Sequence, residues 1–293
     1  MDTNRDARDG DGGGNLHPLH TPAATVPDQI DIIAVHGLNG HYLNTWTATE
    51  TAAKRRFSLW RGGAEVESTS TLWLRDLLPQ KLPNAHVLSF EYDATAFGNK
   101  SAFGVRENSM ALLAAVRDMR EDHGDQARPI IFIGHSLGGI VIKQALTFAT
   151  HSETKWKGIV ESTKGVVFFG TPHRGADAAR WGHTIADIVS TATHRPPATF
   201  LKTLETNSAQ LLQISEDFRP SVDRYAIASF YEQHAHPALG TVVVDKLSAL
   251  LWLPNEEANM MSGDHSAMCK FAKGDRRFDR VWRTIKRVSR GRE

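Results

Sequence analysis

The sequence predicts an α/β fold with a mostly parallel central sheet and helices on both faces. Short apolar runs alternate with longer segments of helical spacing from Ile30 onward, which is the order typical of a parallel sheet. The stretch Ile130–Gly139 (IIFIGHSLGG) places a β-branched run, a glycine-flanked serine and a helix-like run in succession. The 293-residue chain is 41% hydrophobic, which is enough for one large core.

Each expected element follows from local spacing and from the Gly and Pro residues that interrupt it. Strands are expected at Ile30–Val35, Ala85–Tyr92, Pro129–Ile133, Gly165–Phe169, Arg224–Phe230 and, more briefly, Ala258–Met261. Helices are expected at Thr71–Leu82, Val105–Glu121, Leu137–Ala149, behind the apolar run Thr241–Val244, and over about 275–289. Two amphipathic segments separated by Pro196-Pro197 predict a helical insert over about 176–219, which we interpret as a small lid.

The first 29 residues are rich in Asp, Gly, Pro, Thr and Asn and carry almost no large apolar side chains. We therefore expect a disordered tail over 1–29, followed by one domain over 30–293. The tail has no apolar signal segment, and its four aspartates before Leu16 argue against a mitochondrial presequence. No run approaches the roughly 18 apolar residues of a membrane span, so we expect an intracellular, cytoplasmic protein.

The composition excludes several function classes. A net charge of +1 gives no reason to expect nucleic acid as a partner. The single cysteine, Cys269, rules out an intramolecular disulfide, and we expect it to be a small buried residue. The sequence has no phosphate-binding loop, no dinucleotide fingerprint and no Cys/His cluster with metal-ligand spacing, so we expect neither a cofactor nor a metal. It gives no indication of the oligomeric state.

The serine in the stretch 134–138 (GHSLG) has the G-x-S-x-G pattern of a nucleophile elbow. Such a turn joins a strand to a helix and holds the serine in a strained backbone conformation that points it into a cleft. Gly134 and Gly138 fit because a Cβ atom there would collide where the helix crosses the strand. We therefore predict Ser136 as a nucleophile.

A serine hydroxyl is a weak nucleophile at neutral pH, so it needs a base, and the base needs an orienting acid. Enzymes with this elbow carry the three groups in the chain order serine, acid, histidine. Of the 14 histidines, His234, His236 and His265 follow the strand expected at 224–230. We predict His265 as the base, because it lies between a short apolar segment and a helix start at Ser266, where the last strand would deliver it.

The acid is expected just after the strand that ends at Phe230. Glu232 is our first choice, and Asp245, at the end of a short apolar run, is the second. Asp93, which follows the strand before the elbow, is a weaker candidate. Asp264 directly precedes the predicted base, and we set it aside because adjacent side chains rarely face each other.

Negative charge on a substrate oxygen needs preorganised donors, usually two backbone N–H groups. The N–H of Leu137, directly after the serine and at the start of a helix, is the first predicted donor of this oxyanion hole. The second should come from the loop after the first strand, residues 36–40 (HGLNG). Leu38, which follows the His-Gly pair, is our choice.

Two further features border or flank the predicted cleft. His173 lies in the loop 171–175 (TPHRG), directly after a strand, where α/β sheets place their ligands. We prefer an anchoring role for His173, through hydrogen bonds, over contact with substrate. The closing helix is basic around an apolar stripe, and we interpret it as packed on the sheet with a solvated basic face. The alternative is peripheral contact with an anionic membrane surface.

Four blocks of the sequence together resemble the serine active site-containing esterases, which are α/β-hydrolases of the lipase superfamily. These blocks are 33–38 (IAVHGL), 134–146 (GHSLGGIVIKQAL), 168–175 (FFGTPHRG) and 264–269 (DHSAMC). The resemblance covers about residues 30–290 and extends to the esterase-like domain of fungal NOD-like receptor proteins. It implies an α/β-hydrolase fold with Ser136 as nucleophile and His265 as base, and it points towards phospholipid metabolism.

The sequence therefore predicts a serine hydrolase that cleaves a carboxylic ester, of a lipid or another acyl compound, through an acyl-enzyme on Ser136. A thioesterase or acyltransferase in a biosynthetic pathway is the nearest alternative, since the acyl acceptor need not be water. A non-catalytic signalling or interaction module of the NOD-like receptor type is the alternative from another class. The intact elbow and the intact loops at 36–40 and 264–265 count against that alternative.

Overall fold

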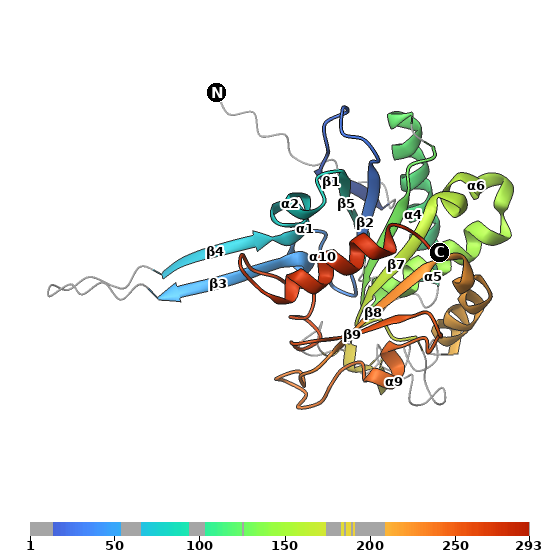
Figure 1. Ribbon diagram of the computed structural model, residues 1–293. Helices are drawn as coiled ribbons and strands as arrows, with labels where there is room; N and C mark the ends of the chain where they lie inside the picture. The colour runs from blue at the N-terminus through green and yellow to red at the C-terminus, as the bar shows by residue number, and fades with distance from the viewer. Residues whose placement is uncertain are drawn as a thin grey trace, which may run out of the picture.

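The computed structural model describes residues 14–53, 66–93, 103–124, 126–173, 183–184, 186–188, 190 and 209–292. Among these residues, seven strands form the main sheet, in the order β1-β5-β2-β6-β7-β8-β9 (Figure 1). The strands are β1 (Asn15–His20), β2 (Ile30–Val35), β5 (Ala85–Glu91), β6 (Ile130–His135), β7 (Thr163–Phe169), β8 (Ala226–Glu232) and β9 (Glu257–Met261). Every neighbouring pair is parallel except β1 and β5.

Helices cover both faces of this sheet (Figure 1). In the described part they are α1 (Trp73–Asp76), α2 (Leu78–Lys81), α4 (Phe103–His123), α5 (Leu137–His151), α6 (Glu153–Ser162), α9 (Lys246–Ala249) and α10 (Arg277–Val288), with 3-10 turns η1 (Asn44–Trp46) and η2 (Arg219–Arg224). Residues 209–218 are also helical. The predicted α/β architecture, mostly parallel with helices on both faces, is confirmed.

The core consists of two apolar layers, one on each side of the sheet. Successive strand residues belong to different layers, since Ile32 packs on the α10 side and Ile33 on the α4 and α5 side. Both side chains are fully buried. Strands buried on both faces form continuous apolar runs, which is why β2, β5, β6 and β7 could be located in the sequence.

The expected disordered tail over 1–29 is wrong for Asn15–His20, which form β1. This strand pairs antiparallel with β5 at the edge of the sheet. His17 Nε2 lies 2.7 Å from Glu91 Oε2, and His20 Nδ1 lies 2.8 Å from the carbonyl oxygen of Ala85. The strand has no fully buried residue and therefore no apolar pattern to detect, because backbone pairing with the edge of β5 holds it in place. The sheet thus begins at Asn15 and not at Ile30.

The segment around Thr71–Leu82, expected as one helix, has a different structure. Residues Val66–Leu72 form β4, which pairs antiparallel with β3 (Thr47–Ala53) in a hairpin that extends away from the main sheet (Figure 1). The two short helices α1 and α2 then follow, on either side of Leu77. Three of the apolar side chains that suggested one helix are buried, but each comes from a different one of these elements: Leu72, Trp73 and Leu78.

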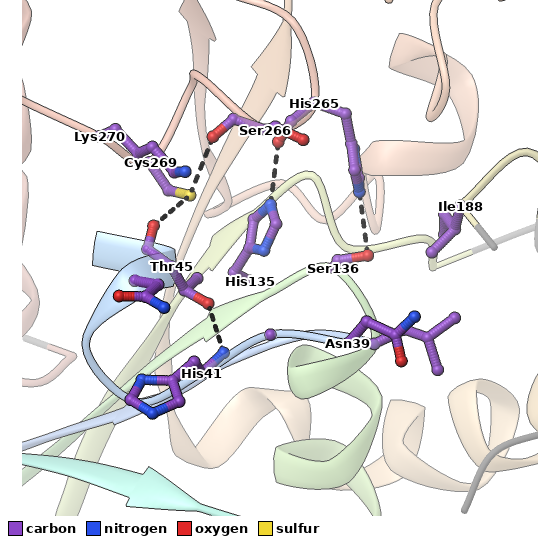
Figure 2. A pocket seen from close by; sticks show the side chains of 13 residues that line it. Asn39, His41, Thr45, His135, Ser136, Ile188, His265, Ser266, Cys269 and Lys270 are labelled. Carbon is purple, nitrogen blue, oxygen red and sulfur yellow. Dashed lines mark hydrogen bonds between the residues drawn. The ribbon is translucent and has the colours of Figure 1, made fainter. Parts of the chain in front are cut away.

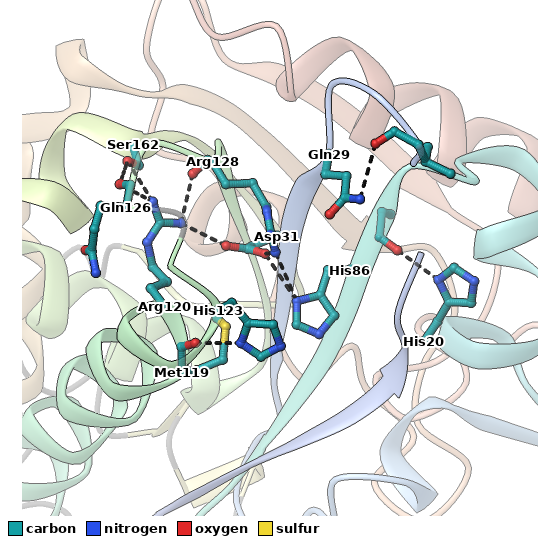
Figure 3. Close-up of polar contacts among 12 residues, drawn as sticks. His20, Gln29, Asp31, His86, Met119, Arg120, His123, Gln126, Arg128 and Ser162 are labelled. Carbon is teal, nitrogen blue, oxygen red and sulfur yellow. Dashed lines mark hydrogen bonds and ion pairs between the residues drawn. The ribbon is translucent and has the colours of Figure 1, made fainter. Parts of the chain in front are cut away.

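A buried ionic cluster lies at the amino end of β2, and Figure 3 shows its side chains. Asp31, near the start of β2, accepts from Arg120 Nη1 of α4 at 2.8 Å and from Arg128 Nη1 at 2.9 Å. Arg120 also donates to Ser162 Oγ at the end of α6 and to the carbonyl oxygen of Arg128. One guanidinium therefore connects β2, α4, α6 and the start of β6.

Most of the helical insert expected over 176–219 lies outside the described residues. Within its described part, residues 186–188 and 209–218 are helical, as expected. Leu211, Ile214 and Phe218 are buried in the layer that covers α5. Ile188 borders the pocket at the carboxyl end of the sheet.

Candidate active site

Ser136 lies in a strained turn between β6 and α5. Its backbone angles are φ 53° and ψ −127°, a conformation that L-residues rarely adopt. A Cβ atom on Gly134 would lie 2.7 Å from Gly139 Cα, and one on Gly138 would lie 2.3 Å from the carbonyl oxygen of His36. The two glycines of the motif therefore permit close contact of the turn with α5 and with the loop after β2.

The loop over 36–40 packs directly against this turn. A Cβ atom on Gly37 would lie 2.9 Å from Ser136 Cβ, so the backbone before Leu38 touches the serine. The Tyr92 hydroxyl donates to the carbonyl oxygen of His36 at 2.7 Å and holds the loop from behind. Within the described part of the chain, the N–H groups of Leu38 and Leu137 donate to no other residue. Both are thus free to bind an external oxygen.

His265 joins Ser136 to Glu232. His265 Nε2 lies 2.9 Å from Ser136 Oγ, and His265 Nδ1 lies 3.1 Å from Glu232 Oε1 (Figure 2 shows the first of these contacts). With its proton on Nδ1, the imidazole donates to the carboxylate and accepts from the serine hydroxyl. The structure brings together the three residues that the chain order singled out.

Glu232, the last residue of β8, is held by backbone N–H groups. Val244 N–H donates to Oε1 at 2.7 Å and Val243 N–H donates to Oε2 at 3.2 Å. The apolar run expected before α9 thus supplies two donors to the carboxylate. Because the side chain is fully buried, these bonds and the contact with His265 fix its orientation.

The other candidate carboxylates have different partners. Asp245 Oδ1 accepts from Ser248 N–H at 2.9 Å and so caps the start of α9. Asp264 Oδ1 accepts from the N–H groups of Ser266 and Ala267, which shapes the turn that carries His265. Asp93, which follows β5, is exposed. The carboxylate that the His265 ring contacts is that of Glu232.

His135 lies inside the elbow motif, but the pattern G-x-S-x-G leaves its position open and so predicts no role for it. Its Nε2 lies 2.9 Å from the carbonyl oxygen of His265 (Figure 2). Burial lowers the pKa of His135 to about 3, with a further lowering from the nearby His265, so the ring is neutral and donates this bond. His135 therefore fixes the backbone of the residue that contacts Ser136. In the sequence, only its position directly before the predicted nucleophile could have indicated this role.

Two other polar groups near the site are kept uncharged by burial. The pKa of His36 is lowered to about 4, mainly by desolvation, and the ring stacks on Tyr92 with centroids 4.4 Å apart. Burial raises the pKa of the Cys269 thiol to about 12, so it is not a thiolate at neutral pH. The expectation of a buried Cys269 is confirmed.

A pocket opens in front of Ser136 and His265 (Figure 2). Its wall combines the loop after β2, which includes Leu38 and His41, with the turn after His265 and with Ile188. In the part of the chain that the structure describes, no group of three or more His, Cys, Asp or Glu side chains is placed to hold a metal ion.

Comparison with known protein families agrees with this architecture. Residues 26–217 match the family model described as a PGAP1-like alpha/beta domain. The chain belongs to this family. The match to the PGAP1-like model includes the loop after β2, the elbow and the 171–175 loop.

Curated relatives of this PGAP1-like chain include Protein SERAC1 from two vertebrates. The Danio rerio protein is 27% identical over 269 residues, which cover 89% of this chain and 39% of that protein. The Homo sapiens protein is 24% identical over 276 residues, which cover 90% of this chain and 39% of that protein. The resemblance to serine active site-containing esterases is thus confirmed, and the chain spans about 39% of the length of these relatives.

Solved structures show the same fold. The mature lipase BlEst2 of Bacillus licheniformis superposes with a TM-score of 0.53 at 16% identity, covering 92% of this chain and 97% of that chain. A soluble variant of the monoglyceride lipase of Saccharomyces cerevisiae gives a TM-score of 0.50 at 10% identity, covering 95% and 92%. The PGAP1-like chain therefore has the α/β-hydrolase fold and is related to esterases and lipases.

Proposed function

We propose that the chain is a serine hydrolase that cleaves a carboxylic ester, of a lipid or another acyl compound, through an acyl-enzyme on Ser136. The observation that carries this proposal is the continuous contact from Glu232 through His265 to Ser136 Oγ at the strained turn. A serine held in this conformation, with a buried imidazole and carboxylate behind it, is the arrangement that activates a hydroxyl for acyl transfer.

In the first half of the reaction, Ser136 Oγ attacks the carbonyl carbon of the ester while His265 Nε2 takes the hydroxyl proton. The negative charge moves to the carbonyl oxygen, which the N–H groups of Leu38 and Leu137 stabilise. Glu232 stabilises the imidazolium that forms and keeps its ring oriented. When the C–O bond to the alcohol breaks, His265 returns the proton to the leaving oxygen.

In the second half, a water molecule attacks the acyl-enzyme and gives its proton to His265. The same two N–H groups hold the second oxyanion, and the acid leaves as Ser136 regains its proton. An alcohol, thiol or amine in place of water would make the same site a transferase. The relation to esterases and lipases supports water as the acceptor.

A fluorophosphonate probe tests the proposal, because it phosphonylates only a serine that a neighbouring base has activated. We expect labelling of the wild-type protein and none of Ser136→Ala or His265→Ala. Ser136→Ala should fold normally, since a serine hydroxyl in a cleft contributes little packing. Probe-reactive protein would then be screened against short acyl esters, lipid esters and thioesters.

Each result bears on a different candidate function. A folded wild-type protein that stays unlabelled would contradict the hydrolase proposal and favour a non-catalytic interaction module. Labelling followed by faster turnover of thioesters than of oxygen esters would favour the thioesterase alternative. Labelling that survives in Ser136→Ala would overturn the assignment of the nucleophile.

A further inference from the structure

Lys143 is a buried lysine on α5, two helical turns beyond Ser136. Its side chain is fully buried and donates to three acceptors, which come from two other parts of the chain. Nζ lies 3.2 Å from the carbonyl oxygen of Pro172, 3.1 Å from His173 Nδ1 and 2.8 Å from Ser215 Oγ. An ammonium group has three N–H donors, and all of them are used here.

No carboxylate in the described residues forms an ion pair with Lys143. Burial lowers the pKa of Lys143 to about 7, and it outweighs Glu216, which raises this pKa through space. A buried cation without a counter-ion costs free energy of folding, and an apolar residue of the same size would avoid that cost. Stability alone therefore does not explain a lysine at this position.

The loop that Lys143 holds is in contact with His265. Thr171 packs on Gly139, one turn before Lys143, since a Cβ atom on that glycine would lie 2.2 Å from Thr171 Oγ1. Gly170 has φ 53°, and a Cβ atom there would lie 3.1 Å from two atoms of the His265 ring. Residues 170–173 thus run along α5 from the imidazole to the lysine.

The same loop connects to the backbone that holds Glu232. His173 N–H donates to the carbonyl oxygen of Ser248 in α9 at 2.7 Å, a backbone bond that ties the loop to α9. The residues directly before α9 include Val243 and Val244, whose N–H groups bind the Glu232 carboxylate. Contacts therefore run from Lys143 to both partners of Ser136.

We propose that Lys143 is a positioning residue, whose buried ammonium group joins the helix after the nucleophile to the loop on His265 and to the helix over 209–218, and so keeps Ser136, His265 and Glu232 aligned. This inference rests on the proposed function. It also explains why a lysine interrupts the apolar run of α5 and why the loop over 171–175 contains a buried histidine, since Lys143 and His173 contact each other.

The test compares Lys143→Met with Lys155→Met, the same change at an exposed lysine on α6. We expect Lys143→Met to fold and to be at least as stable as the wild-type protein, because it removes a buried charge. Its stability gain should be largest below pH 7 and shrink towards pH 10, because the amine of the unfolded wild-type chain then also loses its proton. Its kcat and its fluorophosphonate labelling rate should fall about ten- to a hundredfold with little change in KM, since small misplacements of reacting groups have effects of this size.

Ser215→Ala provides a second, milder variant, with Ser109→Ala as its control. Ser109 is also buried and donates to the carbonyl oxygen of Val141 in α5, but it is not one of the acceptors of Lys143. We expect Ser215→Ala to lower the labelling rate severalfold and Ser109→Ala to leave it unchanged. Equal rates in Lys143→Met and wild-type protein, or equal losses in both serine variants, would overturn the inference.

Amide hydrogen exchange separates this inference from the proposed function. The N–H of His173 should exchange faster in Lys143→Met than in wild-type or Lys155→Met protein. If the wild-type protein reacts with no probe but this exchange accelerates as expected, the hydrolase proposal fails and the structural link stands. If the wild-type protein is labelled and the exchange of His173 is unchanged, the positioning role is wrong.

Discussion

Ser136, Glu232 and His265 lie at or just after the carboxyl ends of three different strands, β6, β8 and β9, which are parallel members of one sheet. Parallel strands end at the same edge, so residues separated by up to 129 positions come within hydrogen-bond distance. Neighbouring groups then fix the position of each side chain. The strained turn orients Ser136, and the N–H groups at 243–244 orient Glu232. The ring of His135 holds the backbone of His265.

At the scale of single residues, Glu232→Gln should lower kcat about 10³- to 10⁴-fold with little change in KM. The amide keeps the shape of the side chain but removes the negative charge that orients and stabilises the imidazolium. Asp245→Asn is the matched control and should retain full activity, because asparagine also caps a helix. Steady-state kinetics on any accepted ester measures both. A large loss in Asp245→Asn with little loss in Glu232→Gln would reverse the choice of acid.

At the scale of elements, α10 has two distinct faces. Its apolar side chains Phe278, Val281, Ile285 and Val288 are buried against the sheet, as the sequence predicts. Its outer face carries four arginines and one acid that line a hollow beside Asn259 of the edge strand β9: Arg276, Asp279, Arg280, Arg283 and Arg287. Met260 of that strand is 48% exposed nearby, and its carbonyl oxygen accepts from Arg280. No described helix is both long and apolar enough to cross a membrane.

We therefore propose peripheral contact of α10 with an anionic lipid surface. The protein should bind vesicles that contain an anionic phospholipid more tightly than vesicles of phosphatidylcholine alone, and salt should weaken this binding. The double variant Arg276→Glu/Arg283→Glu should bind at least about tenfold more weakly, at about 1 kcal/mol for each arginine. Lys155→Glu/Lys157→Glu, the same charge change on α6, is the control. Binding that is indifferent to salt would contradict the proposal.

The Asp31 cluster gives a second prediction for elements (Figure 3). Arg120→Met removes the guanidinium that connects β2, α4 and α6, and it leaves a buried carboxylate with less compensation. The free energy of unfolding should fall by about 3–5 kcal/mol. Arg117→Met, on the exposed side of α4, should leave it nearly unchanged, because exposed ion pairs contribute little. Denaturant unfolding measures both, and similar values for the two variants would contradict a structural role of the cluster.

For the molecule as a whole, the buried neutral histidines predict acid sensitivity. The folded-state pKa values of His36 and His135, about 4 and about 3, lie below the value of about 6.5 for an unfolded chain. Between pH 6.5 and 4 the unfolded state therefore binds more protons, and the free energy of unfolding falls as the pH falls. His36→Asn should show a shallower decline than the wild-type protein when urea unfolding is measured from pH 7 to pH 4. Parallel declines would contradict this assignment.

The sequence by itself determined the features that depend on local pattern. Strands buried on both faces can be recognised in the sequence because burial requires a continuous apolar run. The elbow can be recognised because its backbone conformation requires glycines on both sides of the serine. The chain order serine, acid, histidine then predicted His265 as the base of Ser136 and Glu232, ahead of Asp245, as the acid. This order is informative because the carboxyl ends of parallel strands lie at one edge of the sheet.

Only the tertiary structure decided what depends on contacts between distant segments. Strand β1 has no apolar pattern of its own and exists because β5 offers an unpaired edge. Glu232 and Asp245 carry the same functional group, and their hydrogen bonds decide their roles. The N–H groups of Val243 and Val244 hold Glu232 beside His265. The N–H of Ser248 holds Asp245 at the start of a helix. The partnership of Lys143 with His173 joins positions 30 residues apart, and no local propensity encodes such a contact.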